Sequence, residues 1–202
     1  MASDFHTHFP RNGINALVSA KTLQSGNYTS FEFHPWFLPD EFSVSRLPAP
    51  DTLAPFDAIG EIGLDKLRGP ELPVQEKYLY ALLDIAVQTG KPVVLHTVRS
   101  FPETLAVLKN FPLKVMVHGF RSSPEMLDEL WKKGITVSFH LKAVGNPLLM
   151  NKLHHAKGPF GFESDDRQDI DIREIISMVS RQFAIPGLEE ITDRNFADFL
   201  GM

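Results

Sequence analysis

The sequence predicts an α/β protein, a compact (β/α)8 TIM-like barrel that lacks the helices after its first and second strands. Three observations support this fold class. Eight short β-rich runs follow one another along the chain, helical patterns separate the later runs, and several runs are apolar throughout, as buried parallel strands are. The chain has 202 residues, fewer than the ~250 typical of such barrels. We expect a single domain over residues 1–202.

The expected strands are short runs of the length that buried parallel strands show. They are Ala2–His8, Asn15–Ala20, Tyr28–His34, Ala58–Leu64, Pro92–Thr97, Lys114–Gly119, Ile135–His140 and Phe160–Asp165. Four of the expected helices are Val74–Thr89, Pro147–Lys157, Ile172–Phe183 and Leu188–Leu200. Another begins at Pro124 behind the capping residue Ser123 and ends at Gly134. All five helices follow the fourth strand.

The first two crossovers are too short to contain a helix. Only Phe9 to Ile14 separate the first two strands, and only Lys21 to Asn27 separate the next two, whereas a parallel crossover usually needs a dozen residues or more. Six or seven extended residues can span ~20 Å, about one strand length. We therefore expect an apolar flank without helices, which invites a homo-oligomer or cover by another segment. The proline-rich loop from Pro35 to Pro55 is a candidate for that cover.

The composition limits the chemistry that the chain can perform. It contains no cysteine, so a metal must be held by His, Asp, Glu or water. The formal net charge is −5, with Lys and Arg scattered along the chain, which argues against a protein that grips long nucleic acid. There is no signal-peptide pattern and no apolar run long enough for a membrane span. We expect a cytoplasmic location and no membrane partner.

Metal-binding side chains recur near strand ends. His6 and His8 lie two residues apart and so share one face of a strand. The other candidates are also strand residues: His34, Glu61, His96, His118, His140 and Asp165. In a parallel barrel such strand ends meet at one rim, where barrel enzymes keep their sites. One histidine at a strand end is more often structural, but a converging set predicts a metal site.

The motifs, taken in order, resemble the TatD-type metal-dependent hydrolases of the amidohydrolase superfamily over nearly the whole chain. The matching pieces are Asp4-Phe5-His6-Thr7-His8, Phe33-His34-Pro35-Trp36, Gly60-Glu61-Ile62-Gly63-Leu64-Asp65, Gln75, Pro92-Val93-Val94-Leu95-His96-Thr97, Val117-His118-Gly119-Phe120, Glu163-Ser164-Asp165 and Thr192-Asp193-Arg194-Asn195-Phe196. Each motif alone is weak, and the specificity lies in the complete ordered set.

The resemblance implies two divalent cations, which could be zinc, magnesium or manganese. His6, His8 and Asp165 would bind one cation, His96 and His118 the second, and Glu61 would bridge them. Such a pair, ~3.5–4 Å apart, activates water and stabilises the oxygens of a phosphodiester. Glu61 and Asp165 are thus the expected catalytic residues, and Asp165 is either a ligand alone or also the group that accepts the proton of the attacking water.

Five further residues are expected to bind substrate or to support the ligands. His34 would contact a substrate phosphate or a ligand, or would only be packed beside Pro35. Asp4 would orient His6 or His8, or would make an N-terminal structural hydrogen bond. The other expected supporting residues are Glu163, His140 and Arg99.

The chain departs from the family pattern around the substrate. Family members usually have an arginine two residues after the fifth-strand histidine, where this chain has Val98. At the position of the family's second helix glutamine, this chain has Leu82. The segment after Asp165 is short and acidic, 166–169. We predict a phosphodiester hydrolase, a TatD-like deoxyribonuclease or exonuclease acting on 3′ ends. Two alternatives stay open: hydrolysis of a small non-nucleic ester or amide, and a degenerate barrel used for binding or assembly.

Overall fold

The structure is a computed structural model that describes residues 1–202. Its residue contacts divide the chain into two compact units. Unit 1 consists of residues 1–18, 24–28 and 115–202, and unit 2 consists of residues 19–23 and 29–114. The expectation of a single domain stays a prediction.

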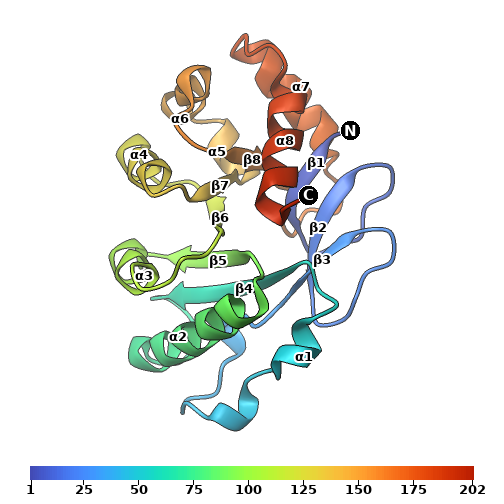
Figure 1. The fold of residues 1–202 in the computed structure, drawn as a ribbon. Helices are drawn as coiled ribbons and strands as arrows, with labels where there is room; N and C mark the ends of the chain where they lie inside the picture. The colour runs from blue at the N-terminus through green and yellow to red at the C-terminus, as the bar shows by residue number, and fades with distance from the viewer. The chain divides into compact units, whose positions relative to one another are not determined.

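Eight strands follow one another in sequence order, and the pairings within each unit are parallel (Figure 1). They are β1 (Ser3–Thr7), β2 (Asn15–Ala20), β3 (Tyr28–Phe31), β4 (Ala58–Asp65), β5 (Val93–Val98), β6 (Val115–Phe120), β7 (Thr136–Phe139) and β8 (Phe160–Phe162). Each of the eight expected runs overlaps one of these strands, and β4, β5 and β6 each extend one residue beyond the expected run. In unit 1, β8 also approaches β1, through a parallel bridge between Thr7 and Asp165.

Unit 2 is built around the pairing of β4 with β5. The longest helix, α2 (Leu72–Thr89), packs on β4 through buried side chains and ends at Gly90, which adopts the left-handed conformation. The other helices of this unit are short: η1 (Pro35–Phe37), η2 (Val44–Arg46), α1 (Pro50–Leu53) and α3 (Phe101–Leu108). The segment expected to be an irregular loop, Pro35–Pro55, therefore contains three single-turn helices. It packs against α2, where Phe42 contacts Tyr78.

Unit 1 contains the C-terminal helices. These are α4 (Pro124–Lys132), α5 (Leu141–Val144), α6 (Pro147–Asn151), η3 (Lys152–His155), α7 (Ile172–Gln182) and α8 (Leu188–Leu200). Ser123 caps α4 as expected, by accepting a hydrogen bond from the main-chain N–H of Met126. The helix expected over Pro147–Lys157 is divided into α6 and η3. Two short helices, α3 and α5, were not expected, since eight and four residues are too few to show a helical period.

No helix follows β1 or β2, as the sequence predicts. The flank is nevertheless not an open apolar face. In unit 1, α8 packs on both β1 and β8, and Phe196 contacts Phe5 and Tyr28. The apolar residues of β2, Ala16 to Val18, are fully buried. No helix of the structure is both long and apolar enough to cross a membrane.

Candidate functional site

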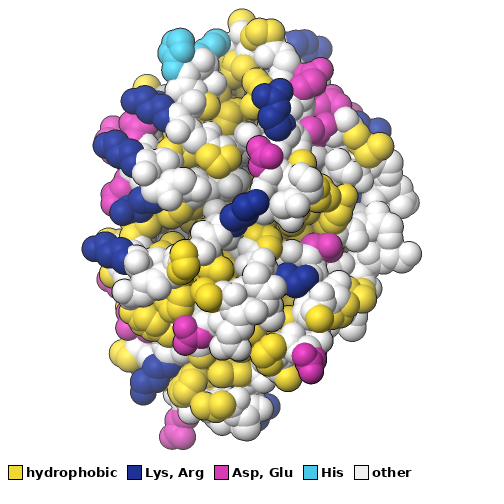
Figure 2. Space-filling view, in the orientation of Figure 1, with side chains coloured by type: hydrophobic (Ala, Val, Ile, Leu, Met, Phe, Trp, Pro, Cys, Tyr) yellow, Lys and Arg dark blue, Asp and Glu magenta, His cyan; other side chains and the backbone are white.

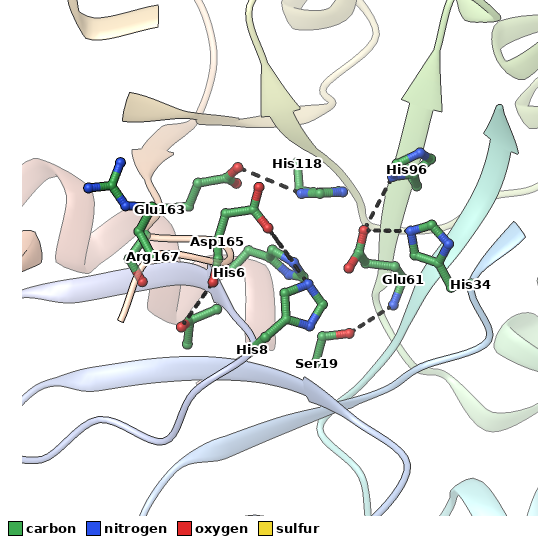
Figure 3. Close-up of polar contacts among 12 residues, drawn as sticks. His6, His8, Ser19, His34, Glu61, His96, His118, Glu163, Asp165 and Arg167 are labelled. Atoms are coloured by element: carbon green, nitrogen blue, oxygen red, sulfur yellow. Dashed lines mark hydrogen bonds and ion pairs between the residues drawn. The ribbon is translucent and has the colours of Figure 1, made fainter. Parts of the chain in front are cut away.

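The predicted ligands lie in two clusters, one in each unit (Figure 3). The unit 2 cluster consists of His34, Glu61, Asp65 and His96. The unit 1 cluster consists of His6, His8, His118, Glu163 and Asp165. The ligand atoms of His34, Glu61 and His96 lie within 4.8 Å of one another, and so do those of His6, His118 and Asp165.

In unit 2, two buried serines hold the strand that carries Glu61. Ser19 accepts a hydrogen bond from the main-chain N–H of Glu61 at 3.2 Å, and both Ser19 and Ser30 donate to the carbonyl of Gly60. The Glu61 side chain is 2% exposed. Burial of a carboxylate is costly unless it is paired or bound to a cation, so this environment fits a ligand.

His96 is held between two carboxylates. Its Nε2 lies 3.0 Å from Oδ2 of Asp65, and its Nδ1 lies 3.3 Å from Oε2 of Glu61 (Figure 3 shows the latter contact). Burial alone would raise the pKa of Asp65, but hydrogen bonds from Trp36 and His96 outweigh it and lower that pKa. The ionised Asp65 accepts the hydrogen on Nε2, so in the neutral ring Nδ1 presents its lone pair to Glu61.

His34 has the opposite tautomer to His96. Its Nδ1 accepts the main-chain N–H of Trp36 at 3.1 Å, an N-cap contact at the start of η1. The hydrogen of the neutral ring is therefore on Nε2, which lies 3.4 Å from Oε2 of Glu61. His34 is thus placed as a hydrogen-bond donor and not as a cation ligand.

In unit 1, the main chain of β1 fixes Asp165. The N–H of Asp165 donates to the carbonyl of His6 at 3.0 Å, and its carbonyl accepts from the N–H of His8 at 3.1 Å. Asp165 adopts a positive φ of 52°. Its Oδ1 lies 3.6 Å from Nε2 of His8 and 3.9 Å from Nε2 of His6 (Figure 3 shows the pairing). The backbone thus sets both the position and the direction of this carboxylate.

His118 has a supporting carboxylate of its own. Its Nδ1 lies 3.6 Å from Oε1 of Glu163, whose other oxygen accepts a hydrogen bond from Ser138. Burial would raise the pKa of Glu163, but the contacts with His118 and Ser138 outweigh it and lower that pKa. Glu163 therefore directs Nε2 of His118 toward the cluster, where the rings of His6 and His118 lie 4.3 Å apart.

The structure places Asp4 on Ser164 and not on a histidine. Its two oxygens accept from the N–H and the hydroxyl of Ser164, at 3.1 and 2.6 Å. Burial raises the pKa of Asp4 to about 6 despite these hydrogen bonds. Arg11 donates to the Ser164 hydroxyl and to three carbonyls of the segment after it. Asp4 and Arg11 thus hold the chain on either side of Asp165.

The two remaining expected residues differ: His140 lies beside Asp165, whereas Arg99 does not contact a cluster. Nε2 of His140 lies 3.8 Å from Oδ2 of Asp165, and its Nδ1 accepts the N–H of Lys142, which is again an N-cap contact. Arg99 has a positive φ of 54° and an exposed side chain, and the structure gives it no polar partner. Nothing in unit 2 connects Arg99 with the cluster.

Sequence reasoning missed the residues that orient the ligands: Arg11, Ser19, Ser30, Asp65 and Ser138. A signal existed for Asp65, which has the same strand parity as Glu61 and so points to the same face. Ser19 and Ser30 carried no signal, because their partners are main-chain groups of another strand. Ser138 carried none, because its partner is the side chain of Glu163, 25 residues further along the chain.

The chemistry of the donor set fits divalent cations. In unit 2, the Nδ1 lone pair of His96 and an oxygen of Glu61 face each other at 3.3 Å, and two acceptor atoms at this distance need a proton or a cation between them. In unit 1, imidazole nitrogens and a carboxylate converge without any thiolate, the mixture that suits zinc, manganese or magnesium.

Comparison with known proteins identifies a family and a fold. The family model described as TatD related DNase matches residues 6–146, well over half of the chain. The structure of YjjV, a TatD homologue from Escherichia coli K12, aligns with a TM-score of 0.78 at 19% identity, covering 100% of this chain and 98% of the other. A hydrolase TatD family protein from Entamoeba histolytica aligns with a TM-score of 0.71 at 15% identity, covering 93% and 84%.

No curated protein matches the sequence. At these identities the two structures establish the fold alone, and they confirm the (β/α)8 class that the sequence predicts.

Proposed function

The chain belongs to the TatD-related DNase family, which consists of metal-dependent hydrolases, and from that premise we propose that it cleaves phosphodiester bonds at the 3′ ends of nucleic acid strands. The observation that carries the proposal is a carboxylate behind a histidine in each unit, Asp65 behind His96 and Glu163 behind His118. This pairing fixes the ring orientation of histidines that bind cations. It occurs twice, which matches the two cations expected.

The proposed ligands are His6, His8, His118 and Asp165 in unit 1 and Glu61 and His96 in unit 2. Bound divalent cations would supply an activated water and stabilise the charge that develops on the phosphoryl oxygens. The expectation that Glu61 binds both cations stays a prediction. Loss of both cations from a Glu61→Gln protein would support it.

Asp165 is the residue that we propose to accept the proton of the attacking water. Its main chain is fixed by His6 and His8, and its side chain is 23% exposed, so it is both oriented and accessible. Nε2 of His140 approaches the second oxygen of the same carboxylate at 3.8 Å. His34 points its Nε2–H at Glu61 and would donate to a charged oxygen nearby.

The test combines metal restoration with one substitution. Protein dialysed against chelator is supplied with magnesium, manganese or zinc and given a 3′-labelled single-stranded oligonucleotide, bis(p-nitrophenyl) phosphate and a dipeptide panel. We expect metal-restored cleavage of both phosphodiesters. Glu61→Gln should lower kcat/KM by about 100-fold or more, because it removes the charge of a buried ligand.

Glu41→Gln is the matched control, since Glu41 is exposed and its side chain makes no polar contact. Full activity of the Glu61→Gln protein would contradict the proposal. Cleavage of dipeptides with both phosphodiesters left intact would favour the alternative of a small non-nucleic substrate. The acidic segment at 166–169 is the sequence feature that favours this alternative. A cytoplasmic location and self-association likewise stay predictions, which fractionation and mass measurement in solution can test.

A further inference from the structure

Arg68, in the loop after β4, is a cation without an anionic partner. Its guanidinium carbon lies 4.3 Å from the centre of the Trp36 ring, and no carboxylate lies within ion-pair distance of it. The other cation of this loop, Lys66, is paired with Glu103 at 2.6 Å. Stacking on an aromatic ring orients a guanidinium while leaving its N–H groups available for another ligand.

The main chain of Arg68 is fixed from both sides. Its N–H donates to Oδ1 of Asp65 at 3.2 Å, and its carbonyl accepts from Nε2 of Gln75 at 3.1 Å. The same Gln75 nitrogen also donates to the carbonyls of Asp65 and Pro70. The loop is therefore held in one conformation by two buried side chains.

The ring under Arg68 is fixed by the same carboxylate. Nε1 of Trp36 donates to Oδ2 of Asp65 at 2.5 Å, and this oxygen also contacts Nε2 of His96. Asp65 thus links a proposed cation ligand, His96, to the Trp36 ring on which Arg68 stacks. A fixed geometry of this kind lowers the ordering cost of binding a second charged group.

The loop borders a hollow of about 440 Å³ lined by residues 65–72, a volume within the range of roughly 300–1,000 Å³ typical of small-ligand sites. Four of the lining side chains are charged. Asp65 accepts four hydrogen bonds and Lys66 is paired, so neither offsets Arg68. Glu71 lines the same hollow without pairing with Arg68.

We infer that Arg68, held on Trp36, binds a second phosphate of the substrate, so that the enzyme prefers a strand with at least two phosphates over an isolated phosphodiester. The inference rests on the proposed function and assigns its substrate specificity. A guanidinium suits this role because its planar N–H groups match phosphate oxygens in pairs.

The experiment compares substrates with one phosphate and with several. Arg68→Ala should lower kcat/KM for a single-stranded tetranucleotide by about 10-fold, the size of one charge-assisted hydrogen bond, and leave bis(p-nitrophenyl) phosphate unchanged. Glu71→Gln should have the opposite effect and favour the tetranucleotide. Arg46→Ala removes an exposed cation of the same unit and should change neither substrate.

A second measurement does not depend on turnover. Binding of a fluorescein-labelled dT10 strand to chelated protein is followed by anisotropy over a range of salt concentrations. Arg68→Ala should lower the slope of log Kd against log salt by about 0.7, the contribution of one single-strand phosphate contact.

The outcomes separate the two claims. If the unmodified protein cleaves no phosphodiester, the proposed function fails, and the anisotropy series still decides the role of Arg68. Equal losses on both substrates after Arg68→Ala, or an unchanged salt slope, would overturn the inference.

Discussion

At the residue scale, the structure separates histidines that can bind a cation from histidines that can only donate. His34 and His140 each accept the N–H of the residue two positions on, and each begins a short helix. This contact consumes the Nδ1 lone pair, so the neutral ring keeps its hydrogen on Nε2. His96 has the reverse arrangement, with its hydrogen directed to Asp65. Ring orientation, and not the mere presence of histidine, thus assigns the role.

This distinction predicts different results for two histidines of the unit 2 cluster. His34→Asn keeps an acceptor for the N–H of Trp36 but removes the Nε2 donor. We expect normal metal content, measured by elemental analysis, and a kcat reduced roughly 100-fold, as for loss of one oriented donor. His96→Ala should lose cation. Equal loss of metal from both proteins would show that His34 is a ligand after all.

The sequence was sufficient to predict which side chains cluster as proposed ligands, but not their orientation. His6, His8, Glu61, His96 and His118 could be predicted because strand parity and strand ends are visible in one chain. The contacts of Asp4 could not, because the position of Ser164 beside it depends on how β8 meets β1. Arg99 has a positive φ and an exposed side chain, and no residue pattern indicated either.

At the element scale, two glycines allow β4 and β5 to approach closely. A Cβ at Gly60 would lie 2.4 Å from the carbonyl oxygen of Val94, and one at Gly63 would lie 2.0 Å from that of His96. Both glycines have a φ of 146°, a value that side chains rarely permit. They flank Glu61 on the same strand. The Gly-Glu-Ile-Gly motif therefore sets the distance between two proposed ligands, Glu61 and His96.

Gly63→Ala should consequently disturb the cluster as well as the fold. We expect a loss of about 2–4 kcal/mol in the free energy of unfolding, from backbone strain and overpacking together, and weaker metal binding. Gly90→Ala is the matched control, because Gly90 has a positive φ but open space around it. It should cost only about 1–2 kcal/mol. Urea denaturation of chelated protein measures both, and equal losses would contradict the close-approach argument.

The long helices of the later chain could be predicted from apolar spacing, whereas α3 and α5 could not. These two helices have eight and four residues, and only one or two residues separate each from the preceding strand. Their formation depends on where the preceding strand ends and not on a local apolar period. The three single-turn helices in Pro35–Pro55 were likewise too short to be predicted from apolar spacing.

At the scale of the whole molecule, charge limits how nucleic acid can be held. The net charge is −5, and on the face drawn in Figure 2 basic side chains lie among apolar and acidic ones and form no continuous block. Affinity for a long strand depends on many simultaneous phosphate contacts. This surface favours a small number of contacts near the reacting end.

We therefore expect activity to depend little on strand length. The kcat/KM values for 3′-labelled strands of 4 and 30 nucleotides should agree within about threefold. The slope of log Kd against log salt should be no greater than about 2, as three single-strand phosphate contacts give. Gel-based cleavage assays measure the first quantity, and anisotropy of labelled strands bound to chelated protein over a range of salt concentrations measures the second. A steep gain in kcat/KM with strand length would contradict this expectation and would indicate an extended basic track outside the face drawn in Figure 2.

The bridge between Thr7 and Asp165 has a consequence for biosynthesis. His6 and His8 are synthesised well before Asp165, whose carboxylate their main chain fixes and which lies after the last strand, β8. A nascent chain therefore cannot bring these proposed ligands together until Asp165 has been synthesised. A cation captured there would then act as a cross-link that closes a very long loop, and its binding energy would add to the stability of the finished fold.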